Sequence, residues 1–155
     1  MHGNIRFAVD RMLGSLAKWL RILGYDTYYR KQIKPINLVS IAQSQDRIII
    51  TKNRWFLKSK FSVKIIFLKS NSLDDMLREV HSFIPLETDR IFTRCIECNE
   101  KTIPVRKEDI KDLVPIYVYE HNEEFSRCKG CGKIYWKGTH FERAMNFIET
   151  LGLGI

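Results

Sequence analysis

Residues 5–29 read IRFAVDRMLGSLAKWLRILGYDTYY, and they contain three elements in succession. Residues 5–9 form a short apolar run, which is typical of a buried strand. Apolar side chains then recur at helical spacing from Met12 to Leu23, and Gly24 follows as a stop signal. Residues 25–29 have the aromatic and β-branched content of a second strand. The stretch therefore predicts a strand–helix–strand unit of an α/β fold.

The same kind of order continues as far as residue 83. Pro35 fits the first turn of a helix over residues 36–44, and two unalternating apolar strands follow at 48–51 and 63–68. A sequence similar to a capping box opens another helix over residues 72–83. Apolar strands without alternation favour a parallel sheet that is covered by helices on both faces. We expect a three-layer α/β domain with a mostly parallel sheet.

Polar side chains follow two of the predicted strands directly. Asp10 ends the first strand and Asn53 follows the strand at 48–51. Ligand sites in α/β folds lie at the carboxyl ends of the strands, so these residues mark a candidate site. The composition changes after a hinge near residue 85, which predicts domains at 1–88 and 89–155. In the second domain we expect short strands at Thr102–Val105 and Pro115–Tyr119 and a helix near His140–Thr150.

The positive charge is concentrated in the first part of the chain. Residues 1–90 hold 16 Lys+Arg against 8 Asp+Glu, whereas residues 91–155 hold 10 of each, which accounts for the net charge of +8. A polyanionic partner such as nucleic acid is favoured. A lysine-rich solvated surface is the alternative. Residues 47–69 contain no acid, and their cations are Arg47, Lys52, Arg54, Lys58, Lys60, Lys64 and Lys69.

The sequence contains no sign of a membrane span or a signal peptide. Its 45% hydrophobic and 28% charged residues are typical of a globular protein in water, and the N-terminal MHGNIRFAVD lacks a long apolar core. We therefore expect a cytoplasmic protein without a membrane partner.

Four cysteines form two C-x-x-C pairs, Cys95/Cys98 and Cys128/Cys131. Each pair directs two sulfurs to one point, and two pairs supply the four thiolates of a structural zinc site. Disulfides and a redox-active pair are the alternatives, and the expected cytoplasmic location weakens both. We expect one Zn²⁺, with the residues between the two pairs forming an insertion.

Cations and aromatic side chains alternate after the second cysteine pair. Such a pattern is typical of contact with RNA, in which bases stack on rings and phosphates meet cations. Packing of the rings against the first domain explains the same pattern. The residues that carry it are Lys133, Tyr135, Trp136, Lys137, His140 and Arg143.

Four motifs together resemble the Mut-seven C-terminal RNase domain family. They are DRMLGSLAKWLRILGYDTYY at 10–29, RIIITKN at 47–53, RCIECN at 94–99 and CKGCGKIYWKGTHFERA at 128–144. The resemblance covers nearly the whole chain and implies a PIN-like domain followed by a C-terminal zinc ribbon. It also implies a metal-dependent ribonuclease in which carboxylates at the strand ends hold Mg²⁺ or Mn²⁺ against a phosphodiester.

The acidic residues that this family uses are mostly replaced in the present sequence. Asp10 matches the first acid, but Asn53 stands at the acid that closes the strand-end motif. Pro35, Ile36 and Asn37 replace the acidic cluster at the start of the second helix, and Gln45 stands at a further acidic position. Hard divalent cations prefer anionic oxygens, so Asp10 is expected to be vestigial. A rearranged site that uses Asp46 or the Asp74/Asp75 pair is the alternative, although helix N-terminal acids are common without a metal.

These observations predict an RNA-binding protein that has lost catalysis. The expected partner is structured RNA, most plausibly ribosomal RNA with neighbouring ribosomal proteins. The alternative function is a metal-dependent endoribonuclease, for which alone Mg²⁺ or Mn²⁺ is needed, and a protein-interaction adaptor is a third class. The predicted RNA-binding residues are Arg11, Lys18, Arg21, Lys52, Arg54, Lys58, Lys60, Lys64, Lys137, His140 and Arg143.

Overall fold

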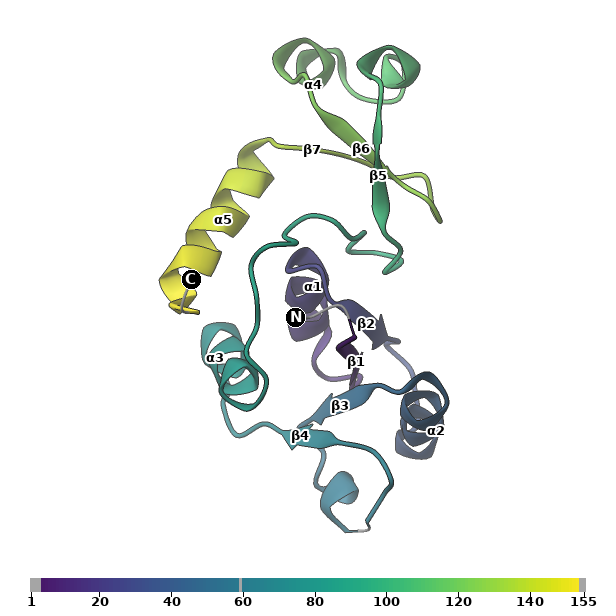
Figure 1. Ribbon diagram of the computed structural model, residues 1–155, viewed down its shortest axis with the longest axis vertical. Coiled ribbons are helices and arrows are strands. Elements are labelled where there is room, and N and C mark those ends of the chain that lie inside the picture. The colour runs from purple at the N-terminus through teal and green to yellow at the C-terminus, as the bar shows by residue number, and fades with distance from the viewer. Residues whose placement is uncertain (1–3, 59, 154–155) are drawn as a thin grey trace.

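The computed structural model describes residues 4–58 and 60–153, and a parallel sheet organises the first half (Figure 1). Its strands are β1 (Arg6–Val9), β2 (Asp26–Tyr29), β3 (Ile48–Thr51) and β4 (Ile65–Phe67). They lie in the order β2-β1-β3-β4, and each neighbouring pair is parallel. All four carboxyl ends therefore meet along one side of the sheet, the carboxyl edge, and all four amino ends along the opposite side, the amino edge.

Helices cover both faces of this sheet. One face packs against α1 (Gly14–Ile22) and α3 (Leu73–Phe83), and the other packs against α2 (Pro35–Gln45). Side chains alternate across a strand, so Phe7 and Val9 join the core under α1 and α3 while Ala8 joins the core under α2. The predicted α/β architecture with its parallel sheet is confirmed, and so are the first strand–helix–strand unit and the helix that begins at Pro35.

The link from α1 to β2 shows how the sequence ends a helix. Gly24 has a φ of 96°, and its N–H donates to Arg21 O at 2.9 Å, while Tyr25 N donates to Leu20 O. A side chain at Gly24 would collide with the backbone of Arg90. Only glycine combines this left-handed turn with such a close approach of two backbones, so the stop signal was correctly interpreted.

A small antiparallel sheet organises the second half. It consists of β5 (Thr102–Val105), β6 (Phe125–Cys128) and β7 (Ile134–Trp136), in that order. The predicted strand at Thr102–Val105 is confirmed. The other two strands were not predicted, because each is short and contains few of the alternating apolar residues that mark a half-buried strand.

The prediction of a strand over Pro115–Tyr119 is wrong. These residues belong to helix α4 (Ile116–His121), which follows the 3₁₀ turn η2 (Lys107–Ile110) in the insertion between β5 and β6. Pro115 caps the helix, and the Tyr117 ring stacks on His121 one turn later, with centroids 3.9 Å apart. Aromatic and β-branched content indicates a strand only where a neighbouring strand and a core are available, and none of the α4 residues is buried.

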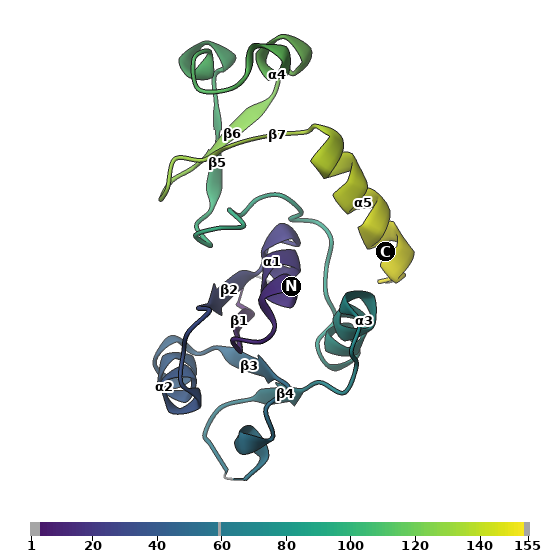
Figure 2. The same ribbon diagram turned by 180° about the vertical axis from the view of Figure 1, so that it is seen from behind.

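The last helix, α5 (Thr139–Leu151), returns to the first half of the molecule. Figures 1 and 2 both show it running from β7 back to α3. Ile148 and Leu151 join the core under α1 and α3, and the Phe147 ring lies 4.6 Å from that of Trp19. The domain limits of 1–88 and 89–155 stay a prediction, since α5 shares the first core. Among residues 4–58 and 60–153, no helix combines the length and the apolar character that crossing a bilayer requires.

Candidate metal centre and nucleic-acid interface

Asp10 lies at the carboxyl edge and is only 1% exposed. Its Oδ2 accepts a hydrogen bond from Thr51 Oγ1 at 2.6 Å, and its Oδ1 accepts one from the backbone N–H of Arg11 at 2.8 Å. Each oxygen of the carboxylate is thus engaged by the protein. The buried acid holds the ends of β1 and β3 together, which is a structural role that the sequence did not indicate.

Asn53 has a structural role in the same network. Its side-chain Oδ1 accepts a hydrogen bond from Trp55 N at 3.0 Å and so caps the 3₁₀ turn η1 (Arg54–Leu57). Its own N–H donates to Thr51 Oγ1, the hydroxyl that donates to Asp10. Asn53 therefore keeps the turn geometry at this strand end without contributing a negative charge.

The structure separates the other expected acid positions from Asp10. Gln45 and Asp46 end α2 immediately before β3, so they lie at the amino edge. Gln45 is therefore not part of the strand-end site, and Asp46 cannot complete a site with Asp10. Asp74 and Asp75 both form ion pairs with Arg78, at 3.2 and 3.1 Å. Their pairing within the first turns of α3 supports the structural interpretation.

Cations surround the carboxyl edge instead. Each strand is followed within three residues by an exposed or half-buried cation: Arg11 after β1, Arg30 after β2, Lys52 after β3 and Lys69 after β4. An open hollow of about 850 Å³ lies between the end of β2 and α2. Its lining includes Arg11, Arg30, Lys34 and Asn37, and none of the described residues contributes a carboxylate to it. Arg30 and Lys34 were missed by the sequence analysis, although their position just after a predicted strand was a usable signal.

The cations of the 47–69 stretch are divided between the two edges. Arg54, Lys58 and Lys60 are exposed on or beside η1. The Lys52 side chain is held by two hydrogen bonds, because its Nζ donates to Ser70 O at 2.7 Å and to Asn71 Oδ1 at 2.6 Å. Lys64 precedes β4 and therefore lies at the amino edge, away from the strand-end hollow. The single basic face predicted for this stretch is thus corrected to a smaller set.

Arg21 does not belong to an exposed basic stripe on α1. It is buried, and its guanidinium donates to the carbonyls of Thr27 at 3.0 Å, Ile96 at 3.0 Å and Glu97 at 3.2 Å. The predicted role of Arg21 in RNA binding is wrong, because the side chain is buried and its Nε and Nη1 already donate to three backbone oxygens. The residue instead connects α1 and β2 with the first cysteine pair, and this leaves Lys18 as the exposed cation of α1.

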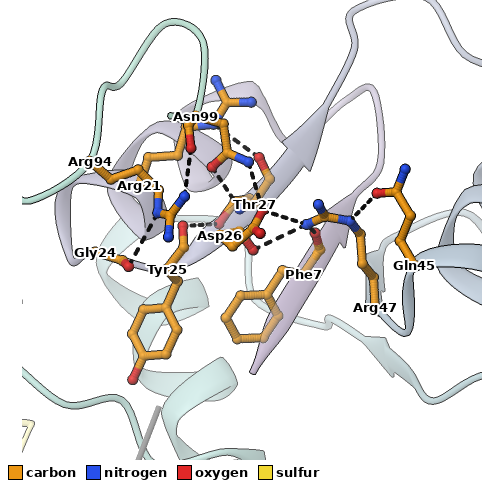
Figure 3. Close-up of polar contacts among 10 residues, drawn as sticks. All are labelled: Phe7, Arg21, Gly24, Tyr25, Asp26, Thr27, Gln45, Arg47, Arg94 and Asn99. Atoms are coloured by element: carbon orange, nitrogen blue, oxygen red, sulfur yellow. Dashed lines mark hydrogen bonds and ion pairs between the residues drawn. The ribbon is translucent and has the colours of Figure 1, made fainter. Parts of the chain in front are cut away.

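Figure 3 shows the polar network that joins the amino edge to Asn99. Asn99 directly follows the first cysteine pair. Asp26 Oδ1 accepts hydrogen bonds from Arg47 Nη1 at 2.8 Å and Asn99 Nδ2 at 2.7 Å. Asn99 Oδ1 in turn accepts from Thr27 N at 2.8 Å, on the open side of the outermost strand β2. Burial alone would raise the pKa of Asp26, but its partners Asn99 and Arg47 outweigh this and hold the pKa below its usual value. Arg47 is therefore not available for RNA.

The four cysteines converge on one point. Cys95, Cys98, Cys128 and Cys131 have sulfurs that all lie within 4.8 Å of one another. Cys95 Sγ lies 3.8 Å from Cys131 Sγ, and Cys98 Sγ lies 3.0 Å from Cys128 Sγ. Four sulfurs at a Zn–S distance of about 2.3 Å have tetrahedral edges of about 3.8 Å, so the donor set fits Zn²⁺. The predicted clustering into a metal-binding set is confirmed.

Neighbouring groups orient these thiolates. Tyr135 Oη lies 3.0 Å from Cys95 Sγ and also accepts from Ile96 N, while the N–H groups of Gly130 and Cys131 point at Cys128 Sγ. Burial and the contact with Cys95 raise the pKa of Tyr135. Hydrogen bonds of this kind hold the ligands of a structural metal site in place.

The remaining predicted RNA contacts lie around β7 and α5. His140 and Arg143 are exposed on α5, and Lys137 precedes that helix with its Nζ 5.6 Å from the centroid of Phe141. Lys137 also lies 3.5 Å from Glu124. The neighbouring aromatic residues serve partly in packing, because Tyr135 contacts the cysteine site.

The match to a family model decides the classification. The Mut7-C RNAse domain model matches residues 5–148, from β1 to the last turns of α5. The chain belongs to the Mut7-C RNase domain family. No curated protein matches it. Membership confirms the resemblance to the Mut-seven C-terminal family and connects this Mut7-C domain with RNA-directed, nuclease-like function.

The hydrogen bonds of Asp10 lead to a prediction about stability. Asp10→Asn should lower the free energy of unfolding by about 1–3 kcal/mol, because an amide cannot accept from both Thr51 and Arg11 as the carboxylate does. Urea unfolding would show a lower midpoint with an unchanged slope. Asp112→Asn, at an exposed position in the insertion, is the matched control and should change stability by less than about 0.5 kcal/mol. Equal midpoints for both variants would contradict the structural role of Asp10.

Proposed function

We propose that this Mut7-C domain binds structured RNA through its carboxyl edge and does not cleave it. The observation that carries the proposal is the replacement of a carboxylate cluster by cations around one buried, fully hydrogen-bonded acid. Phosphate contacts need cations that are free to approach, and Arg11, Arg30 and Lys34 line an open hollow there. Divalent-metal catalysis needs several accessible anionic oxygens, and Asp10 is 1% exposed.

The proposal extends to the architecture and the partner. The first half is proposed as a PIN-like domain and the second as a zinc ribbon, with Zn²⁺ at the four cysteines as the structural ion. Ribosomal RNA with neighbouring ribosomal proteins is the proposed partner, in the cytoplasm. A small basic protein suits a fixed place on a large RNA.

Binding and cleavage assays on one preparation test the proposal. A radiolabelled RNA hairpin should be retained by the protein, and its cleavage in Mg²⁺ or Mn²⁺ should not exceed that seen with Asp10→Asn, provided that this variant is folded. Metal-dependent cleavage that disappears in folded Asp10→Asn would instead establish the endoribonuclease. On a sucrose gradient of cell lysate, the protein should sediment with a ribosomal subunit, and free migration would contradict the ribosomal partner.

A further inference from the structure

A second hollow, of about 460 Å³, lies where α1, the first cysteine pair, β7 and α5 meet. Its walls are mainly aromatic: Trp19, Phe92, Tyr135, Trp136 and Phe141 contribute rings. Its lining includes Lys18, Lys133, His140 and Arg143, and no carboxylate from residues 4–58 or 60–153 is part of it. The hollow is thus an aromatic chamber with a basic margin, and the strand-end hollow at the carboxyl edge does not include any of these residues.

Several of these rings are held in place before any ligand arrives. The Phe92 and Phe141 rings lie 4.6 Å apart, and Phe92 N donates to Ile22 O at 2.8 Å. Phe92 has a φ of 64°, a conformation that costs energy for a bulky residue and often marks a functional site. Gly138 lets the Trp136 indole lie against the backbone, since a Cβ there would come within 2.9 Å of the indole nitrogen. Preordered rings reduce the entropy cost of binding a flat ligand.

The cations at the margin are available to a ligand. Lys18 and Arg143 are exposed, and within residues 4–58 and 60–153 neither of them forms an ion pair. Lys133 is partly engaged, because its Nζ lies 3.1 Å from Glu97 Oε1 and 5.5 Å from the centroid of Tyr135. A flat apolar surface next to free positive charge complements a base with its flanking phosphates. An apolar peptide segment would match the rings but would leave these cations without anions.

We propose that this aromatic chamber accepts an unpaired base of the bound RNA, with Lys18 and Arg143 contacting the adjacent phosphates. The proposal rests on the RNA-binding function and adds the class of RNA, namely a structured RNA that presents a single-stranded loop or bulge. Bases in a duplex are stacked and paired, so their faces cannot reach such a chamber. Arg11, which precedes α1, lines the strand-end hollow, and Lys18 on α1 lines the aromatic chamber, so one RNA that follows α1 can contact both.

A comparison of single-stranded and duplex RNA tests the proposal. The probes are a single-stranded RNA of twelve nucleotides with one central 2-aminopurine and the duplex of the same sequence. Wild-type protein should quench the 2-aminopurine fluorescence of the single strand as the base stacks on a ring. Trp136→Leu should weaken single-strand binding by roughly 5- to 100-fold, which is the contribution of stacking one base, while duplex binding stays within about twofold.

Two further variants complete the design. Lys18→Gln with Arg143→Gln, both at exposed sites, tests the margin without altering the packing, and should also weaken single-strand binding more than duplex binding. Tyr117→Leu replaces an exposed ring on the distant helix α4 and is the matched control, with no expected effect. Zinc content and thermal melting verify that each variant is folded.

The outcomes separate this proposal from the function on which it rests. Two results would overturn the base-binding chamber while leaving RNA binding at the carboxyl edge intact. One is that the chamber variants lose equal affinity for single-stranded and duplex RNA. The other is that the wild-type protein binds the single strand without quenching its 2-aminopurine fluorescence. Failure of the wild-type protein to bind either probe would overturn the proposed function itself, and the chamber with it.

Discussion

Removing the metal is expected to unfold the region between residues 93 and 136 and to lower the melting temperature of the whole chain. Structural zinc contributes on the order of 10 kcal/mol to the folding of small domains, and the short strands β5, β6 and β7 have little core of their own. Metal analysis of the intact protein should give about one zinc per chain. Cys128→Ser should reproduce the effect of a chelator.

The amino-edge network predicts a more specific consequence of zinc loss. Asn99 follows the first cysteine pair and receives the N–H of Thr27, so this amide of β2 is protected by a residue 72 positions away. Hydrogen exchange of Thr27 should accelerate strongly in the metal-free protein and in Asn99→Ala. The amide of Asp10, which donates to Ile50 O inside the sheet, is the control and should stay protected. A metal-free preparation with an unchanged cooperative melt and a protected Thr27 would contradict the role assigned to the cysteines.

Neutralising the carboxyl-edge cations is expected to weaken RNA binding on the order of 10²-fold at low salt. The triple variant Arg11→Gln, Arg30→Gln, Lys34→Gln removes the cations of the strand-end hollow. If each contacts one phosphate, the slope of log K against log salt concentration should fall by about two to three units, because fewer counterions are released.

A control variant with the same change in charge tests where on the molecule RNA binds. Lys101, Lys111 and Lys129 are exposed in the second half, and replacing all three with Gln removes the same charge. If the location of the cations determines RNA affinity, this control should change the affinity by less than about threefold. If net charge alone determines it, the control should lose as much affinity as the first variant. Equal losses would show that the RNA face is elsewhere. The melts of both triple variants should match that of wild type, since none of the six side chains is buried.

Local sequence patterns predicted most of the fold. The apolar run at residues 5–9, the helical spacing up to Leu23 and the glycine at 24 predicted the first strand–helix–strand unit, because each depends on a few neighbouring residues. The sequence also predicted the cysteine site, because two C-x-x-C pairs in one chain are typical of a metal site. The strand at Pro115–Tyr119 was mispredicted because its residue types favour a strand that had no partner.

The use of each charged side chain depended on tertiary structure. Helical spacing placed Arg21 and Lys18 alike on α1, yet Arg21 is buried against the carbonyls of Ile96 and Glu97, which lie 75 and 76 residues away. Arg47 was equally misplaced, because its partner Asp26 comes from another strand. Tertiary contacts decide whether a cation is exposed or buried, because they bring backbone oxygens and carboxylates from distant parts of the chain to it. The spacing of residues along the sequence does not predict these contacts. The sequence by itself predicted a parallel sheet and a four-thiolate site. Only the tertiary structure determined that Asp10 is buried and that Arg30 and Lys34 line an open hollow at the carboxyl edge.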